Sequence, residues 1–260
     1  MDLQLKDKVV LITGGAKGIG EAITRGVIRE NGIPVIVDVD AQAGKRLQSE
    51  MQNSGKACGL ICENLLTAEN CSRSVDQTLK EFGRLDVLIN NAGVNDGVGL
   101  ENGSPEKFVT SLQKNLLHYY NMAYYALPAL KKSQGVIVNI ASKTALTGQG
   151  GTSGYVAAKG AILALTREWA AELLPFGIRV NAVVPAEVMT PLYEQWLSTF
   201  PNPEEKLKQI VAKIPLGKRM THADEIAAMV LFLSSAQASH ITGQHLFVDG
   251  GYVHLDRALT

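Results

Sequence analysis

Short runs of consecutive apolar residues recur along the chain, and longer stretches with helical spacing separate them. The runs predict strands at residues 9–12, 34–37, 87–89, 135–140, 178–183 and 245–248. Their apolar residues do not alternate with polar ones, which is typical of parallel strands covered on both faces. The stretches between them predict helices near 18–31, 41–53, 68–82, 105–131 and 155–175. This order predicts an α/β fold with a single doubly wound parallel sheet and helices on both faces.

Local signals mark the starts of some helices and bear on domain organisation. Ser104-Pro105 combines a helix-capping residue with a proline suited to the first helical position. Residues 221–224, Thr-His-Ala-Asp, have the spacing of a capping box. Residues 186–218 contain four prolines and predict a segment of loop and helix that covers the substrate. Because no repeat or linker divides the chain, we expect residues 1–260 to form a single domain.

Composition excludes several classes of partner. The 260-residue chain has 25 Lys+Arg and 25 Asp+Glu, so it has no net basic field to attract nucleic acid. No apolar run reaches the roughly 18 residues of a membrane helix, and the polar N-terminus is no signal peptide. These features predict a cytoplasmic protein whose partner is a small molecule.

The three cysteines, Cys58, Cys62 and Cys71, do not form a metal-binding pattern. A zinc site needs a fourth ligand at CxxC-like spacing, and the sequence offers none. We therefore expect free thiols in a reducing compartment and no metal.

A glycine-rich turn follows the first predicted strand and opens the first helix. Residues 13–20 read Thr-Gly-Gly-Ala-Lys-Gly-Ile-Gly, with Gly14, Gly18 and Gly20 in the turn and Ile19 between the last two. Glycines here let backbone N–H groups approach a pyrophosphate, which the helix N-terminus also attracts. Strand, glycine turn and helix together predict a dinucleotide-binding Rossmann fold.

Two charged residues bear on the choice of dinucleotide. Asp38 ends the second predicted strand, 24 positions after Gly14, near the offset at which an acid binds the adenosine ribose. Its carboxylate would repel a 2′-phosphate, whereas Lys17 in the glycine turn could pair with one. Because Asp38 would lie directly at the ribose, we predict NAD as the cofactor. Residues 90–93, Asn-Asn-Ala-Gly, follow another strand and would let the backbone pass close to the ribose and nicotinamide.

Tyr155 and Lys159 are spaced i, i+4 and share one face of the predicted helix. A tyrosine with an ordinary pKa near ~10 is a poor base at neutral pH, but a nearby ammonium favours its phenolate. Ser142 follows a predicted strand and could donate a hydrogen bond to the reacting oxygen. Asn115 is a poor helix former inside helix 105–131, and it would be retained there if it held water in a proton relay to Lys159.

Taken together, these motifs resemble those of the short-chain dehydrogenases/reductases. The similarity covers essentially the whole chain and runs through 13–20, 90–93, Asn115, Ser142, 155–159 and 185–190 to the closing Val-Asp-Gly-Gly at 248–251. It implies that Asn115, Ser142, Tyr155 and Lys159 form the catalytic tetrad, with Lys159 also binding the nicotinamide ribose.

The same resemblance implies further cofactor contacts. They involve Asn64 and Leu65 near the adenine, Asn91, Ala92 and Gly93 near the ribose, and Val188 and Thr190 at the carboxamide and phosphates. Two positions depart from the family pattern. Asn64 stands where the family has an acid, which weakens the adenine contact. Pro185-Ala186 replaces Pro-Gly, which shifts the loop carrying Glu187 towards the substrate.

Polar residues gather on the loops that follow the predicted strands. Such loops lie at the carboxyl edge of an open α/β sheet, where ligands bind, and they carry Asn95, Asp96, Lys143, Gln149, Thr152 and Glu187. Amides and charged groups suit a polyhydroxylated substrate better than a steroid or an acyl chain. We take Asn95, Lys143, Gln149 and Glu187 as candidate substrate-binding residues.

Segments 93–97, 142–144, 147–150 and 185–193 and the tail 254–259 resemble the L-fucose dehydrogenases of this family. This likeness implies oxidation of an aldose at its anomeric carbon to a lactone. A 17β-hydroxysteroid or other secondary-alcohol dehydrogenase is the main alternative. A non-catalytic NAD-sensing regulator would not need the tetrad, and a nucleotide-sugar epimerase would carry a longer C-terminal domain.

Two helices have more apolar surface than one sheet can cover. Helix 155–175 is apolar around much of its circumference, and helix 105–131 carries Leu116, Leu117, Tyr119, Tyr120, Met122, Tyr124 and Tyr125. The surplus could pack within one chain, but the family resemblance implies the same helices of a second subunit within a homotetramer.

Overall fold

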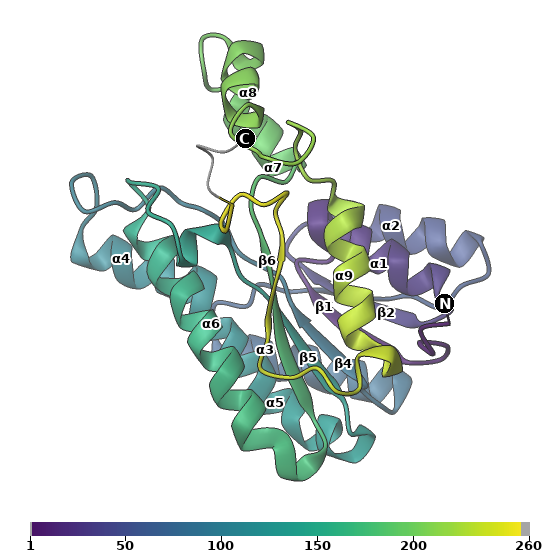
Figure 1. Cartoon of the computed structure of the whole chain (residues 1–260). Coiled ribbons are helices and arrows are strands. Elements are labelled where there is room, and N and C mark those ends of the chain that lie inside the picture. The colour runs from purple at the N-terminus through teal and green to yellow at the C-terminus, as the bar shows by residue number, and fades with distance from the viewer. Residues whose placement is uncertain (1, 256–260) are drawn as a thin grey trace.

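A computed structural model describes residues 2–255, and its centre is a seven-stranded parallel sheet. The strand order is β3-β2-β1-β4-β5-β6-β7 (Figure 1). The strands are β1 Val9–Thr13, β2 Ile33–Asp38, β3 Gly59–Cys62, β4 Val87–Asn90, β5 Val136–Ile140, β6 Arg179–Pro185 and β7 His245–Val248. The doubly wound fold expected from the sequence is confirmed, and the tail residues 256–259 lie outside the described part of the chain.

Helices cover both faces of the sheet. They are α1 Gly18–Arg29, α2 Ala41–Asn53, α3 Ala68–Phe82, α4 Pro105–Leu112, α5 His118–Ser133, α6 Ser153–Leu173, α7 Pro191–Leu197, α8 Pro203–Val211 and α9 Ala223–Ser234. Among the described residues, no helix is long and apolar enough to cross a membrane.

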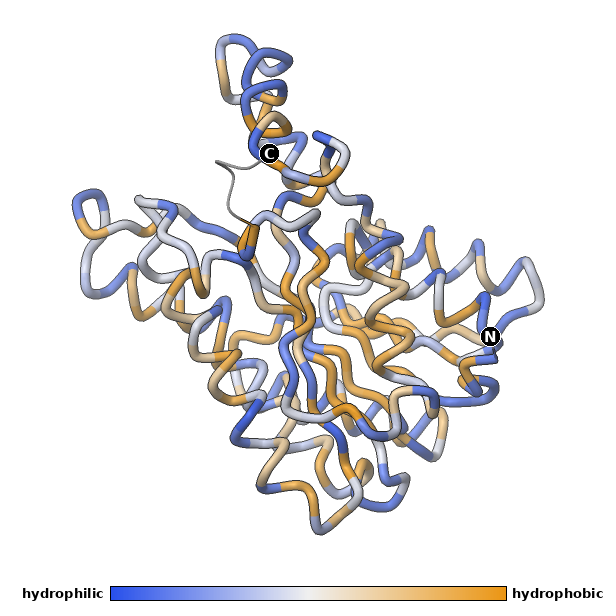
Figure 2. Tube along the Cα trace, in the orientation of Figure 1, coloured by the Kyte–Doolittle hydropathy of each residue, from blue (hydrophilic) through white to orange (hydrophobic). Residues whose placement is uncertain are grey.

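The alternation of side chains along β1 explains its unbroken apolar run. Val9 and Leu11 pack into the core under α3, α5 and α6, whereas Val10 and Ile12 pack against α1 and α9 on the other face. Both faces of the strand are therefore buried, so no position is left for a polar residue. Figure 2 shows the resulting concentration of hydrophobic residues along the central strands.

The predicted helix 105–131 contains a change of helix type. α4 leads into a π-helical turn, Gln113–Leu117, and α5 continues from it. Single π turns are often found at functional sites, and this one holds Asn115. The predicted start is confirmed, because Ser104 Oγ accepts a hydrogen bond from Lys107 N at 3.2 Å and Pro105 opens α4.

The predicted capping box at 221–224 is wrong by one residue. Thr221 forms a parallel bridge with Val188, and its N–H donates to the Glu187 carbonyl at 2.9 Å. This pairing keeps Thr221 extended, so the cap of α9 falls on His222. The Glu225 carboxylate accepts from His222 N at 2.8 Å.

Two of the prolines in segment 186–218 begin short helices. Pro191 and Pro203 each occupy a first-turn position, of α7 and α8, where the missing N–H costs nothing. Both helices lie beyond the carboxyl end of β6, and α8 projects away from the sheet (Figure 1).

Candidate active site

The glycine turn is closed by contacts that only glycine permits. Gly14 has a φ of +63°, and its N–H donates to the Val37 carbonyl at 2.7 Å. A Cβ at Gly20 would lie 1.9 Å from the Gly14 carbonyl oxygen, so a larger residue would force the turn open. Lys17 is the N-cap of α1 and makes no side-chain capping bond. The first amides of α1 therefore have no side-chain acceptor and suit an anionic group.

Asp38 lies at the end of β2 beside the glycine turn. Its Oδ2 accepts from Ala16 N at 3.0 Å, and its Oδ1 accepts from Asp40 N at 2.9 Å. Lys17 forms an ion pair with Asp40. That pairing lowers the pKa of Asp40, although backbone hydrogen bonding from Ala43 N lowers it more. Asp38 and Lys17, the two charged residues that bear on the choice of cofactor, therefore both have partners within the chain beside the glycine turn.

Segment 90–93 is tied directly to the glycine turn. The Asn91 side-chain amide donates to the carbonyls of Thr13 and Gly14, both at 3.0 Å. Thr13 Oγ1 accepts from the N–H groups of Asn91 and Ala92 at 2.9 and 3.1 Å. These bonds hold the ends of β1 and β4 together at the carboxyl edge of the sheet.

Asn115 connects the π turn to the same edge. Its Oδ1 accepts from Val94 N at 2.7 Å, and its Nδ2 donates to the Ser111 carbonyl at 3.0 Å. A Cβ at Gly93 would lie 3.1 Å from Asn115 Oδ1 and 3.6 Å from Lys159 Nζ. Glycine at 93 therefore lets the backbone pass close to both side chains.

Tyr155 and Lys159 lie on α6, with Lys159 Nζ 5.6 Å from the centre of the Tyr155 ring. Burial raises the pKa of Tyr155 to about 12, a value that already includes the smaller lowering effect of a hydrogen bond with Ser142. Burial alone lowers the pKa of Lys159 to about 7. Ser142 Oγ accepts from Thr144 Oγ1 at 3.0 Å, which leaves the Ser142 proton to donate.

Tyr119 is a buried neighbour of Lys159 to which the sequence pattern gave no role beyond the apolar surface of its helix. Lys159 Nζ donates to Tyr119 Oη at 3.0 Å and to the Ile140 carbonyl at 2.7 Å. Tyr119 and Met122 were counted among the apolar residues of helix 105–131, and both belong to the face that is fully buried in the core. The four-residue spacing of Asn115 and Tyr119 was the available signal, since it puts both on one helix face.

Two of the four candidate substrate residues meet. Lys143 and Glu187 form a largely buried ion pair, and Tyr193 Oη from α7 donates to Glu187 Oε2 at 2.8 Å. Burial and the Glu187 carboxylate raise the pKa of Tyr193. Lys143 Nζ also lies 4.0 Å from the centre of the Tyr252 ring. This link between β6, α7 and the C-terminal segment has no local sequence signal, because Lys143, Glu187 and Tyr252 are far apart in sequence.

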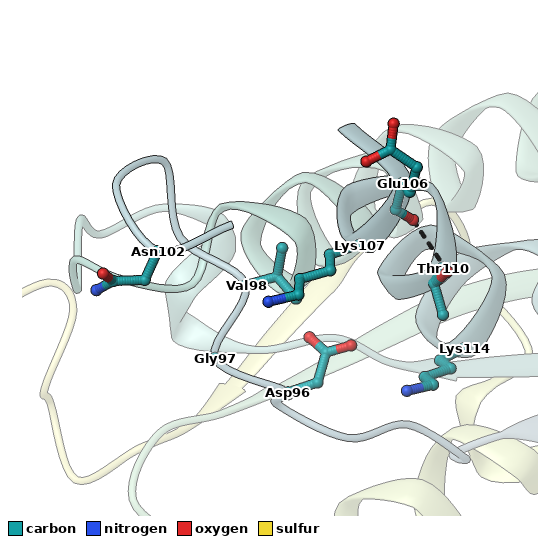
Figure 3. Close-up of a pocket in the computed structure, with 8 residues that line it drawn as sticks. All are labelled: Asp96, Gly97, Val98, Asn102, Glu106, Lys107, Thr110 and Lys114. Carbon is teal, nitrogen blue, oxygen red and sulfur yellow. Dashed lines mark hydrogen bonds between the residues drawn. The ribbon is translucent and has the colours of Figure 1, made fainter. Parts of the chain in front are cut away.

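The other two candidates lie on exposed loops. Asn95 Oδ1 accepts from Gly97 N at 3.3 Å within its own turn, and Gln149 is exposed. The two loops are adjacent, because Gly154 N donates to the Val98 carbonyl at 3.1 Å. Beside them, Asp96 Oδ1 accepts from Ser111 Oγ at 2.8 Å. Asp96 also lines a shallow pocket along α4 that contains no residue of the candidate tetrad (Figure 3).

The remaining candidate cofactor residues have different environments. Asn64 is exposed and its Oδ1 accepts from Asn70 Nδ2 at 2.9 Å, whereas the Leu65 side chain packs in the core. Val188 is buried against α9. Thr190 caps α7, and its Cγ2 would lie 3.2 Å from a Cβ at Gly18. Thr190 therefore closes over the glycine turn.

No group of three or more potential metal ligands occurs among residues 2–255. Cys58, Cys62 and Cys71 are free thiols, as expected. Burial raises the pKa of Cys58 to about 12 and that of Cys71 to about 11, which keeps both protonated and unreactive.

Comparison with known proteins identifies relatives of this chain. A family model described as enoyl-(acyl carrier protein) reductase matches residues 14–253. An L-fucose dehydrogenase of Bos taurus is 36% identical over 96% of this chain and 91% of its own length. A 3alpha-hydroxysteroid dehydrogenase of Mediterraneibacter gnavus is also 36% identical, over 96% of this chain and 98% of its own.

Solved structures extend the likeness to three dimensions. The Cj0485 dehydrogenase superimposes with a TM-score of 0.94 at 47% identity, covering 100% of this chain and 99% of its own. The ligand-free aldohexose dehydrogenase of Thermoplasma acidophilum gives a TM-score of 0.88 at 31% identity, covering 99% and 98%. Both likenesses include the carboxyl edge of the sheet and the segment above it.

Proposed function

Since this chain belongs to the short-chain dehydrogenase/reductase family, we propose that it is an NAD-dependent dehydrogenase of L-fucose or a related aldose. The reaction oxidises the anomeric hydroxyl and gives the lactone. The observation that carries the proposal is the arrangement of the half-buried Tyr155 with the buried Ser142 and Lys159 at the carboxyl edge of the sheet, next to segment 90–93.

The glycine turn and its neighbours fit a nicotinamide dinucleotide. The backbone of the turn is not covered by side chains at Gly14, Gly18 and Gly20. The start of α1, which has no side-chain cap, offers N–H groups to the pyrophosphate. Asp38 would bind the ribose hydroxyls, and Thr190 would contact the phosphates. When bound, the cofactor supplies the acceptor for the hydride that leaves the substrate carbon.

Tyr155 removes the proton of the substrate hydroxyl as the hydride departs. Lys159 favours the phenolate form of Tyr155 through its charge. Ser142 donates a hydrogen bond to the reacting oxygen, which orients it against Tyr155. Asn115 positions segment 93–94 next to Lys159 through its bond with Val94 N.

NAD is favoured over NADP by the charges at the end of β2. The Asp38 carboxylate would repel the 2′-phosphate of NADP. The next residue, Val39, is exposed and apolar, so it offers no charge to bind that phosphate. Lys17 is already paired with Asp40. A 2′-phosphate would therefore have to compete with Asp40 for its cation.

A sugar substrate is supported by the polar cluster of Lys143, Glu187 and Tyr193. Groups of this kind are rarely buried unless they have a polar partner, and several sugar hydroxyls can bridge them. Segment 186–218, with α7 and α8, would cover the bound sugar. Two relatives, an L-fucose dehydrogenase and an aldohexose dehydrogenase, have names that point to the same substrate class.

A hydroxysteroid is the second candidate substrate. One relative is named a 3alpha-hydroxysteroid dehydrogenase, and α7 exposes the apolar residues Leu192 and Trp196. A non-catalytic NAD sensor is disfavoured, because it would gain nothing from burying Lys159 at a cost in stability.

A substrate screen tests the proposal. NADH formation is followed by absorbance with L-fucose, other aldoses, polyols and hydroxysteroids, and we expect turnover with L-fucose or a close stereoisomer. Tyr155→Phe is the matched control, because it keeps the ring but should reduce turnover by ~10²-fold or more. Turnover of hydroxysteroids alone would refute the sugar assignment, and an active Tyr155→Phe variant would refute the role of Tyr155.

A further inference from the structure

The hydroxyl of Tyr119 lies in a closed hydrogen-bonded triangle with Lys159 and Ile140. Lys159 Nζ is 3.0 Å from Tyr119 Oη and 2.7 Å from the Ile140 carbonyl oxygen, and Tyr119 Oη is 2.9 Å from that same oxygen. A carbonyl oxygen only accepts, so the Tyr119 proton points to Ile140. The lone pairs of Tyr119 Oη are then left to accept from the ammonium.

Water cannot replace this acceptor. Tyr119 is 0% exposed and Lys159 is 2% exposed. A buried ammonium depends on the acceptors that the fold gives it, because an unmet donor costs its full desolvation. Tyr119 and the Ile140 carbonyl occupy two of the three donor positions of Lys159.

We propose that Tyr119 is a positioning residue that holds Lys159 in its charged form and in place beside Tyr155. This inference rests on the proposed function, since Lys159 acts there by favouring the phenolate of Tyr155. Tyr119 touches no reacting atom and acts only through Lys159.

Among the described titratable groups around Lys159, Tyr119 is the one that accepts a hydrogen bond from its ammonium. Tyr155 belongs to the same helix, and α5 contributes His118 and Tyr119. Burial lowers the pKa of His118 to about 4, so it is neutral at working pH. Burial raises the pKa of Tyr119 well above its usual value, so it remains a phenol and an acceptor. Burial lowers the pKa of Lys159 itself to about 7. At neutral pH the charged fraction of Lys159 is therefore sensitive to the gain or loss of a single hydrogen bond.

Tyr119→Phe isolates the hydroxyl. The ring remains, and with it the 5.1 Å approach of Lys159 Nζ to the ring centre. Without the acceptor the ammonium is less favoured, so the pKa of Lys159 should fall by about 1. A neutral Lys159 favours the Tyr155 phenolate less, so the rising limb of the pH profile for sugar oxidation should move to higher pH. At neutral pH, kcat should fall ~10-fold with little change in KM.

The direct measurement is the titration of Lys159 by ¹³Cε NMR in the protein without cofactor, with the resonance assigned from Lys159→Met. Tyr120→Phe is the control, because Tyr120 is the next residue on α5 and is 53% exposed. Its Lys159 titration should match the wild type. Tyr119→Met offers a second hydroxyl-free variant if Tyr119→Phe does not fold.

An unchanged Lys159 titration in the hydroxyl-free variants would overturn the inference. So would a loss of kcat with an unmoved pH profile, because a merely structural role predicts that result. This titration needs no substrate. A wild-type protein that oxidises none of the tested alcohols would refute the proposed function, and the titration would still decide whether Tyr119 controls the charge of Lys159.

Discussion

Asp38 performs two tasks with one carboxylate. It accepts a hydrogen bond from Ala16 N in the glycine turn, so it shapes the turn. Its negative charge also lies where the adenosine ribose is expected. A substitution at this position therefore changes both geometry and charge, and two variants are needed to separate them.

Cofactor preference is the prediction at this scale. The wild-type protein should have a kcat/KM for NAD that exceeds that for NADP by ~10²-fold or more, because a 2′-phosphate facing Asp38 is repelled. Asp38→Ala should narrow this gap about tenfold. Asp38→Asn keeps an oxygen for Ala16 N but loses the acceptor for Asp40 N, and it should narrow the gap chiefly by removing the charge. Comparable kcat/KM values for the two cofactors in the wild type would contradict the prediction.

At the scale of elements, the cluster around Glu187 joins three separate parts of the chain. Lys143 follows β5, Glu187 follows β6, and Tyr193 belongs to α7. The hydrogen bond from Tyr193 to Glu187 attaches the helical cover to the edge of the sheet. Substrate binding and the position of α7 should therefore depend on each other.

Glu187→Gln tests this dependence with a side chain of the same size. It keeps an oxygen for Tyr193 but removes the charge that pairs with Lys143 and with sugar hydroxyls. We expect kcat/KM for the sugar to fall tenfold or more, with nearly unchanged NAD affinity in a fluorescence titration. Tyr193→Phe should raise KM for the sugar as well, because α7 loses its attachment. Wild-type sugar kinetics in Glu187→Gln would exclude Glu187 from substrate recognition.

Elements with strong local patterns were predicted correctly, and those that depend on distant contacts were not. The long apolar runs of β1 and β5 and the cap at Ser104 were evident from the sequence. Strand β3 was missed because Gly59–Cys62 is short, contains a glycine and lies at the edge of the sheet. The capping box was predicted one residue too early because Thr221 N donates to the Glu187 carbonyl, a contact that the local sequence does not show.

The candidate site divides in the same way. Tyr155 and Lys159 were found through helical spacing, and the glycine turn through its context. Tyr119 was counted only as an apolar residue of helix 105–131, because an aromatic on an apolar helix has no local signal of polar contact. Only the packing of α5 against β5 and α6 brings its hydroxyl to Lys159.

For the whole molecule, the remaining question is what covers the outer surface of α5 and α6. Tyr120 and Tyr124 are half-exposed on α5, as is Leu117 at the end of the π turn that precedes it. Leu174 and Phe176 are exposed just beyond α6. Apolar surface of this kind is typical of subunit interfaces. We propose that it packs against a second copy of the chain within a homotetramer.

Light scattering at micromolar concentration should give a mass near four times the chain mass of 27.9 kDa. Tyr124→Glu should lower that mass, because it places a charge in the apolar contact. Leu100→Glu is the matched control, since Leu100 is 94% exposed on a loop away from α5. A wild-type mass of one chain would rule out the proposed assembly.

The buried ammonium of Lys159 also has a consequence for the stability of the fold. An unfolded chain holds the Lys159 proton up to its ordinary pKa of 10.5, whereas the folded protein releases it above about 7. Between these values the free energy of unfolding rises with pH, and below about 7 the full penalty applies, on the order of 5 kcal/mol. That sum rivals the whole net stability of many domains. The fold therefore holds a lysine where an apolar residue would be more stable below about pH 7, an arrangement typical of functional sites.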